Sequence, residues 1–144
     1  MKKMKLSVVT VVVFLVCCFA SIPIVNDLTA KSIEKQLARV DLPENTELIE
    51  SLSKAGKLVG NGNGMQYFGA ILIRSEQTLE ELSAYYSHEL ANVVVERQTA
   101  QKIEGVEHEE LSFITDISQT EDYFIVYLFG DGIAPFLNLD IRGY

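Results

Sequence analysis

Two histidines and one short acidic run are the side chains of this sequence that could do metal or acid–base chemistry. The run places four glutamates around one histidine: Glu104, Glu107, His108, Glu109 and Glu110. Carboxylates and an imidazole are ligands for divalent cations. The run lacks the His-x-x-x-His spacing of a helical zinc site and the alternating ligands of a calcium loop. We therefore expect a solvated acidic connection and no metal site.

Neither histidine is accompanied by a recognisable nucleophile. Covalent catalysis needs a hydroxyl or thiol activated by a base. Cys17 and Cys18 lie inside an apolar run near the N-terminus, so the rest of the chain has no thiol. His88 stands on a predicted helix between a serine and a glutamate that project in other directions, and no nucleophile elbow is present. The sequence predicts no catalytic residue. The alternative is a small cell-surface hydrolase whose site assembles around His88 or His108.

A glycine-rich segment separates two predicted strands. It consists of Gly60, Asn61, Gly62, Asn63 and Gly64. Asn-Gly steps tolerate positive φ, so we expect the turn of a β-hairpin. A phosphate-binding loop would lie between a strand and a helix, and the dinucleotide fingerprint with its acidic partner is missing. We predict no cofactor and name these five residues the candidate contact loop.

The beginning of the chain predicts a membrane span. Residues 6–25 carry no charge, and as a helix they cover about 30 Å, the hydrocarbon thickness of a bilayer. Lys2, Lys3 and Lys5 precede this run and favour a cytoplasmic N-terminus, with the residues after 25 outside. The alternative is a signal peptide cleaved near Ala20, which would lead to secretion. Both predictions export the same domain.

Residues 26–43 predict a juxtamembrane stalk helix that ends near Pro43. Its apolar residues recur at intervals of three and four: Ala30, Ile33, Leu37 and Val40. We expect this helix to pack on its own domain, with pairing to a second copy as the alternative.

Residues 44–144 predict an extracytoplasmic α+β domain. Extended segments are expected at residues 46–59, 65–75, 92–103, 111–117, 123–129 and 136–141. Thr78 and Glu81 form a capping-box pattern, which predicts a helix from Leu79 to about Leu90. The order is ββαβββ-like. The predicted fold is an N-terminal transmembrane helix and a stalk helix, followed by an antiparallel sheet of about five to six strands covered by one helix.

The charge of the chain argues against one class of partner. Twenty acidic and 12 basic side chains give a formal net charge of -8. An acidic chain gains nothing from a phosphate backbone, so we expect no nucleic acid as a partner.

Three stretches of the sequence resemble a group of small uncharacterised membrane-anchored proteins of Gram-positive bacteria. They are Leu42-Pro43-Glu44-Asn45-Thr46, residues 54–66 (KAGKLVGNGNGMQ), and Thr78-Leu79-Glu80-Glu81-Leu82 with Tyr85-Tyr86. The resemblance implies an α+β extracytoplasmic domain behind one N-terminal span. No activity and no catalytic residue come with it.

Together these features predict a non-catalytic, membrane-anchored binding or accessory domain outside a bacterial membrane. Its expected partners are the lipid bilayer, through residues 6–25, and another envelope protein. Exposed sheet surface or the candidate contact loop would supply the contact. Besides the hydrolase, an immunity-type or regulatory protein that acts through its membrane helix remains an alternative.

Overall fold

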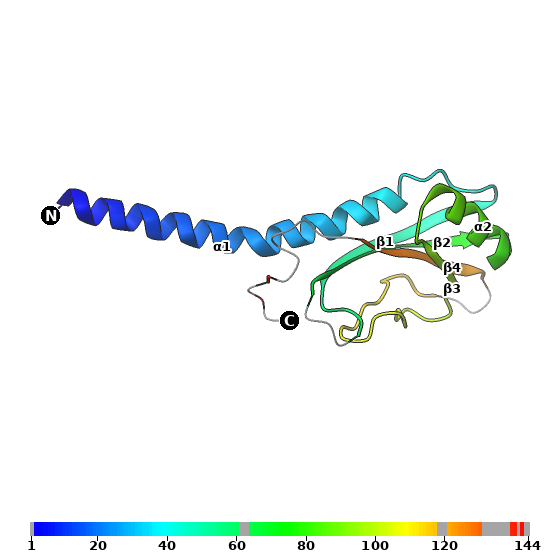
Figure 1. The fold of residues 1–144 in the computed structure, drawn as a ribbon. Helices are drawn as coiled ribbons and strands as arrows, with labels where there is room; N and C mark the ends of the chain where they lie inside the picture. The colour runs from blue at the N-terminus through cyan, green and yellow to red at the C-terminus, as the bar shows by residue number, and fades with distance from the viewer. Residues whose placement is uncertain (1, 61–63, 118–120, 131–138, 141, 143–144) are drawn as a thin grey trace.

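One helix joins the predicted membrane span to an α+β domain (Figure 1). The computed structural model describes residues 2–60, 64–117, 121–130, 139–140 and 142, with side chains from residue 8 onward. Its elements are α1 (Lys2–Leu37), β1 (Thr46–Gly56), β2 (Gln66–Ser75), α2 (Leu79–Glu89), β3 (Val94–Arg97) and β4 (Tyr123–Gly130). The predicted α+β class is confirmed.

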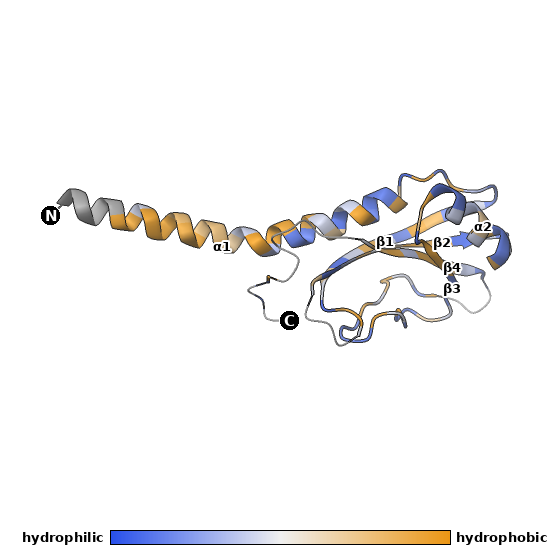
Figure 2. Cartoon of the chain, viewed as in Figure 1, coloured by the Kyte–Doolittle hydropathy of each residue, from blue (hydrophilic) through white to orange (hydrophobic). Residues whose placement is uncertain are grey.

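The helix α1 has two halves with different surroundings. The large apolar side chains between Val8 and Phe19 are 49–66% exposed, and this half projects from the domain as the orange stretch of Figure 2. Further along, Ala30, Ile33 and Leu37 are at most 6% exposed and belong to the core. Their spacing of three and four residues puts them on one helix face, which packs on the sheet. The residues predicted as a stalk are thus part of the folded domain, and the helix ends before Pro43.

The described strands form one antiparallel sheet in the order β1-β2-β4-β3. The pairing of β1 with β2 runs from Thr46 opposite Ser75 to Gly56 opposite Gln66, so the predicted hairpin is confirmed. The central strands β2 and β4 are almost entirely buried. Continuous apolar runs such as these are typical of strands that are covered on both faces.

The prediction of five to six strands is wrong for the described residues, which form four. Residues 111–117 contribute one isolated bridge, between Lys102 and Ser112, and no strand of the sheet. Phe113 and Ile117 are instead buried against the sheet, so their apolar alternation reflects contact with its face. The segment predicted at 92–103 shortens to β3. Of the segment predicted at 136–141, only residues 139 and 140 are described, and they are not in a strand.

Each face of the central strands has its own cover. On one face, α1 and α2 pack over side chains such as Tyr67, Ile71 and Phe124. On the other, residues from the segment 98–117, including Ile103 and Phe113, pack over the opposite side of β2 and β4. The cover is therefore two helices on one side and an irregular segment on the other. The packing of the predicted stalk helix on its own domain agrees with the expectation, whereas the irregular cover was not predicted. The sheet faces offer little of the exposed surface that the sequence suggested for binding.

The side chain of Glu50 fastens the irregular segment to β1. Its carboxylate accepts hydrogen bonds from the backbone amides of Ile114 and Thr115, each at 3.0 Å, and from the Thr115 hydroxyl at 2.9 Å. Burial by itself would raise the pKa of this carboxyl, but these hydrogen bonds lower it below its ordinary value. A bulge between Leu48 and Glu50 sets the local register of the strand.

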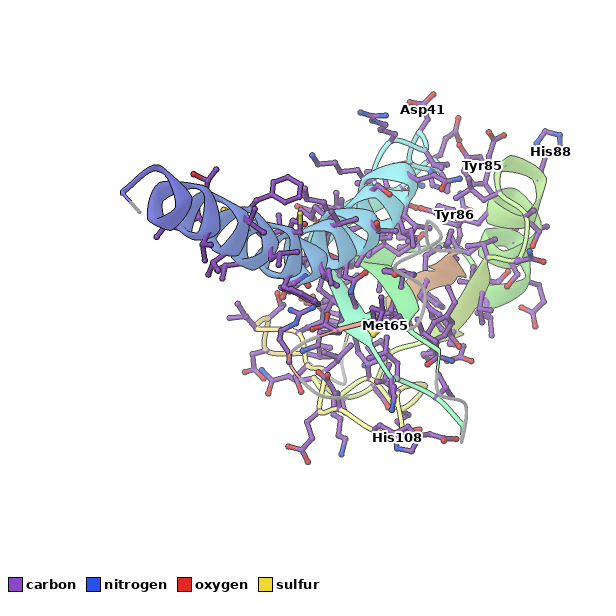
Figure 3. All side chains as sticks on the ribbon, turned by 60° about the vertical axis from the view of Figure 1, so that its left-hand side comes forward. Asp41, Met65, Tyr85, Tyr86, His88 and His108 are labelled. Atoms are coloured by element: carbon purple, nitrogen blue, oxygen red, sulfur yellow. The ribbon has the colours of Figure 1, made fainter. Side chains whose placement is uncertain are left out.

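The helix α2 begins with the predicted capping box. Thr78 Oγ1 accepts a hydrogen bond from the Glu81 amide at 3.3 Å, and the Glu81 carboxylate accepts one from the Thr78 amide at 2.9 Å. Leu82 and Tyr86 are fully buried. Tyr85 donates a hydrogen bond to the Asp41 carbonyl at 2.9 Å, which ties α2 to the segment after α1 (Figure 3).

Candidate functional site

Gly60, the first residue of the candidate contact loop, lies at the end of the sheet where α1 enters the domain. At this end β1 finishes and β2 begins, and the Tyr67 hydroxyl is 2.8 Å from the Asn26 side-chain oxygen on α1. Gly60 is exposed, and its φ of 70° lies in the left-handed region that favours glycine. Of the predicted turn, residues 61–63 lie outside the described residues, whereas Gly64 is described.

Side chains from both neighbouring segments hold the start of this loop. The Gln66 side-chain oxygen accepts hydrogen bonds from the amides of Leu58 and Val59 at 2.8 and 2.7 Å. The Leu58 carbonyl accepts two more, from the amides of Glu107 and His108 at 2.8 and 3.1 Å. The chain that leads into the loop, which is its base, is therefore held in place, because the backbone groups of Leu58 and Val59 have hydrogen-bond partners in the neighbouring segments.

The acidic run helps to form that base. His108 Nε2 donates a hydrogen bond to the Gly60 carbonyl at 2.7 Å, and the Glu107 carboxylate accepts one from the Gly60 amide at 3.0 Å. Two other glutamates of the run form ion pairs, Glu109 with Lys54 at 2.5 Å and Glu110 with Lys102 at 3.6 Å. Among the described residues, no group of three or more His, Cys, Asp or Glu side chains converges to hold a metal ion.

The two histidines lie at different ends of the domain (Figure 3). The His88 ring is 85% exposed on α2, with its Nδ1 atom 3.0 Å from the Glu89 carboxylate. His108 belongs to the base of the loop described above. The structure thus does not bring the two predicted histidines together, and their hydrogen bonds are to a neighbouring carboxylate and to a backbone carbonyl.

A polar cluster that the sequence analysis missed lies where α1 enters the domain. We call Asn26, Tyr67, Asp140 and Arg142 the entry cluster. Asn26 is fully buried; its amide nitrogen donates hydrogen bonds to the Asp140 carboxylate and to the Leu139 carbonyl, each at 3.0 Å. Arg142 contacts the Asp140 carboxylate at 2.6 Å. The cluster joins the helix, the sheet and the C-terminal segment.

The electrostatics of the entry cluster follow from these contacts. The Arg142 guanidinium beside Asp140 holds the pKa of that carboxyl well below its usual range. Burial, together with the Asp140 charge, raises the pKa of Tyr67. At neutral pH the cluster therefore contains a carboxylate, a guanidinium and a neutral phenol, which is an arrangement suited to fixing structure. The sequence signal was weak: a polar pair, Asn26 and Asp27, directly after twenty residues without charge.

A second buried carboxylate lies between α1 and β1. Glu34 is 4% exposed and forms hydrogen bonds with Lys31 and with the Ser51 hydroxyl, each at 2.6 Å. These contacts compensate the cost of burying its charge. The hydrogen bond with Ser51 fixes the position of the core half of α1 relative to β1.

The grooves of the described surface include one at each end of the sheet. One, of about 590 Å³, lies at the far end of the sheet, where Arg74 bridges the carboxylates of Glu47 and Glu121 at 2.6 and 3.0 Å. The other, of about 540 Å³, lies between α1 and β1 near the entry cluster and includes Lys31, Lys54 and Arg142 in its lining. We call the second one the entry groove.

Comparison with known proteins identifies no relative: no protein-family model, no curated protein and no solved structure matches this chain.

Proposed function

We propose that the chain is a single-pass membrane protein of a Gram-positive bacterium, with its N-terminus in the cytoplasm and a non-catalytic binding or accessory domain outside. The supporting observation is the division of α1, whose apolar half is exposed while Ala30, Ile33 and Leu37 are buried. Within Val8–Leu37, α1 contains a stretch that by length and composition can cross a membrane. A bilayer would remove the exposed apolar half from water.

A binding role fits the surfaces that the fold leaves open. In the described part of the chain, β1 pairs with β2 alone, so the outer edge of this 11-residue strand has no strand partner. An open edge can accept an extended segment of another protein. The base of the candidate contact loop, at Gly60, lies at the end of the same strand. We therefore assign the contact with an envelope protein to the β1 edge and this loop.

Fractionation and external proteolysis test the membrane placement. In cells that express the full-length chain, we expect it to remain in the membrane after a carbonate wash, and external protease to digest the domain in protoplasts. Recovery in the soluble fraction would contradict the anchor. Protection of the domain until the membrane is lysed would contradict the orientation.

Photo-cross-linking tests the binding surface. A photo-reactive residue in place of Leu48, an exposed residue of β1, should form an adduct with an envelope protein in intact cells. The matched control replaces Glu89, which is exposed on α2. The same adduct from both positions, or none from position 48, would exclude the β1 edge as the contact.

A regulatory role through the membrane helix is the second candidate. It is favoured by α1, which continues from the apolar half into the core without leaving the helical state. Exchange of residues 6–25 for an unrelated apolar span separates the two roles. A simple anchor should keep its partner and its cellular effect after the exchange, whereas a regulator that acts within the bilayer should lose the effect.

A further inference from the structure

The side of α1 that faces away from the sheet is apolar beyond the predicted end of the span. Ile24 and Leu28 are 59% and 64% exposed, and they lie about 170° around the helix from the buried side chains of Ala30, Ile33 and Leu37. Figure 1 shows the sheet on the other side of α1. In the part of the chain that the structure describes, this apolar side is therefore left open.

Small side chains continue the same side of α1 into the span. Cys17, Ser21, Ile24 and Leu28 follow one another at spacings of four, three and four residues, which keeps them on one side of a helix. We call these four residues the outer face. The Ser21 hydroxyl donates a hydrogen bond to the Cys18 carbonyl of its own helix at 2.7 Å, so it presents a compact surface.

The span is asymmetric in the size of its side chains. Toward the sheet side it carries large ones: Val8, Val12, Leu15 and Phe19. Small residues let two helix backbones approach closely inside a bilayer, and they are typical of contacts between transmembrane helices. The outer face thus has the character of a helix–helix contact, and the sheet side of the span has that of a lipid contact.

Lipid does not cover the far end of the outer face. Asp27, next to Leu28 in the chain, has a side chain that is 57% exposed and pairs with Arg142 at 3.0 Å. Exposed charges are costly inside hydrocarbon, so this level of α1 lies outside it. Leu28 therefore faces water in a single copy of the chain, and burial of its side chain would favour association.

We infer that two copies of the chain pair in one bilayer, with the outer face of α1 as the contact. The inference rests on the proposed function, because it requires α1 to span the membrane. Two copies anchored in the same direction present the same residues at the same depth, so a two-fold axis along α1 brings Cys17 to Cys17 and Leu28 to Leu28. Close approach of small side chains within the bilayer and burial of leucine outside it then favour the same pairing.

The charges that follow the outer face limit the length of the contact. Lys35 lies on the same side of α1, seven residues after Leu28, and the two copies of this lysine would repel each other. Straight helices that cross at about 20° near Ser21 move apart toward Lys35, which relieves the repulsion. The two sheets lie on the far sides of the pair, so both β1 edges remain open to an envelope protein.

Oxidative cross-linking tests the pairing with the chain's own cysteines, which are both exposed. Membranes that contain the full-length chain as C18S, which keeps Cys17, or as C17S, which keeps Cys18, are treated with a copper–phenanthroline oxidant. Cys17 lies on the outer face, whereas Cys18 lies about 100° around the helix. We expect a disulfide-linked dimer from C18S and little from C17S. Equal cross-linking of both variants, or none of C18S, would overturn the pairing.

A second position tests the contact outside the bilayer. In a chain that also carries C17S and C18S, L28C should form the same disulfide-linked dimer under this oxidant. The control is Q36C, at an exposed residue of α1 that lies about 80° around the helix from Leu28, and it should not cross-link. Equal cross-linking at the two positions would contradict the outer face as the contact. An adduct with a chain of different mass would mean that another protein covers this face.

The strength of association tests the contribution of Leu28. Energy transfer between labelled chains in vesicles compares the wild-type chain with Leu28→Ala and with Leu42→Ala, a control at a leucine that is 40% exposed outside α1. Both copies lose contact area in Leu28→Ala, so we expect association to weaken by at least about ten-fold, with Leu42→Ala unchanged. Equal association of all three chains would overturn the contact at Leu28.

Two controls keep these outcomes separate. The substituted residues are exposed in the described structure, and thermal unfolding of each variant checks that its domain is folded. A chain that a carbonate wash extracts from the membrane contradicts the proposed function. A chain that stays anchored but neither cross-links nor associates contradicts the pairing alone.

Discussion

Two buried tyrosines differ in whether their hydroxyls have partners. Tyr67 is 1% exposed and donates its hydrogen bond to Asn26 at 2.8 Å. Tyr86 is fully buried, and within the described structure its hydroxyl has no hydrogen-bond partner. Burial raises the pKa of Tyr86 to about 12, so it stays neutral at physiological pH. The two side chains form a matched pair for measuring the value of one buried hydrogen bond.

We expect Tyr67→Phe to lower the free energy of unfolding by about 1–3 kcal/mol, because Asn26 loses a partner while buried. Tyr86→Phe should leave it unchanged or raise it slightly, because it removes an unpaired polar atom. Chemical denaturation of both variants in one detergent provides the measurement. A larger loss for Tyr86→Phe than for Tyr67→Phe would contradict the described hydrogen bonds.

The entry cluster predicts a pH dependence of stability. Its contact with Arg142 lowers the pKa of Asp140 in the folded state, whereas the unfolded value is about 3.9. The stabilisation is therefore fully present above the unfolded pKa and is lost as the pH falls through the folded pKa. Asp140→Asn should be less stable at pH 7 and should lose less of its remaining stability between pH 5 and pH 2. Thermal unfolding across this range measures how the stability of each protein changes with pH, and Glu89→Gln, at an exposed residue, is the control. If the contact contributes nothing, stability will fall with pH at the same rate in the wild-type chain and in both variants.

Sequence reasoning identified the residues around the contact loop but could not assign their partners. Gly60 was singled out for its conformation, and its φ is indeed positive. The contact of His108 with its carbonyl joins residues 48 positions apart, and Asn26 meets Asp140 over 114 positions. No local pattern encodes such distances. The entry cluster therefore could not be predicted from residue types alone.

At the scale of elements, the approach of α1 to the sheet depends on Gly69 in β2. A Cβ atom built on Gly69 would lie 2.5 Å from the Glu34 backbone nitrogen and 2.8 Å from the Ile33 Cγ2 atom. Real Cβ atoms do not come this close to backbone. A larger residue would therefore push α1 away from the sheet.

Gly69→Ala should lower the free energy of unfolding by about 1–3 kcal/mol, the usual effect of overpacking a core. Gly105→Ala is the matched control, since its Cβ would meet the Tyr127 hydroxyl at 3.5 Å, an ordinary contact. Urea unfolding compares the two. Equal values would mean that α1 does not lie as close to β2 as described.

The start of α2 depends on one hydroxyl. Thr78→Ala removes the side-chain acceptor for the Glu81 amide and should lower the free energy of unfolding by about 1 kcal/mol, within the range for N-cap residues. Thr99→Ala, an exposed threonine outside the helices and strands, should change it by less than about 0.5 kcal/mol. A Thr78→Ala variant as stable as Thr99→Ala would contradict the capping box.

Local signals predicted elements well and their assembly less well. The capping box and the β1–β2 hairpin were predicted because each is encoded within a few neighbouring residues. Residues 111–117 alternate like a strand, yet alternation requires only that one side be buried. Here Phe113 and Ile117 are buried because the segment packs on one face of the sheet without being one of its strands. Periodicity alone cannot distinguish a strand within a sheet from a segment that covers it.

At the scale of the whole molecule, the core half of α1 is an integral part of the fold. Ala30, Ile33 and Leu37 are buried in the same cluster as β2 and β4 side chains. Burial of one isoleucine or leucine contributes about 1.5–3 kcal/mol, and an entire domain is stable by only about 5–15 kcal/mol. Loss of this segment would remove a large share of that margin.

We therefore expect a chain that begins at residue 26 to unfold cooperatively and a chain that begins at residue 44 to lack a cooperative transition. Circular dichroism during heating distinguishes them. A chain starting at residue 44 that melts at the same temperature as the longer one would show that the domain is complete without α1.

The unbroken course of α1 fixes how the domain is oriented toward any protein that meets it. Every residue added to an α-helix turns the attached domain by about 100° and moves it by about 1.5 Å. The rotational orientation of the β1 edge about the helix axis, relative to neighbours in the same bilayer, is thus set by the length of one helix. Insertion or deletion of a single residue before Ile22 would leave the contacts of the core and of the entry cluster intact and would turn the β1 edge toward different neighbours.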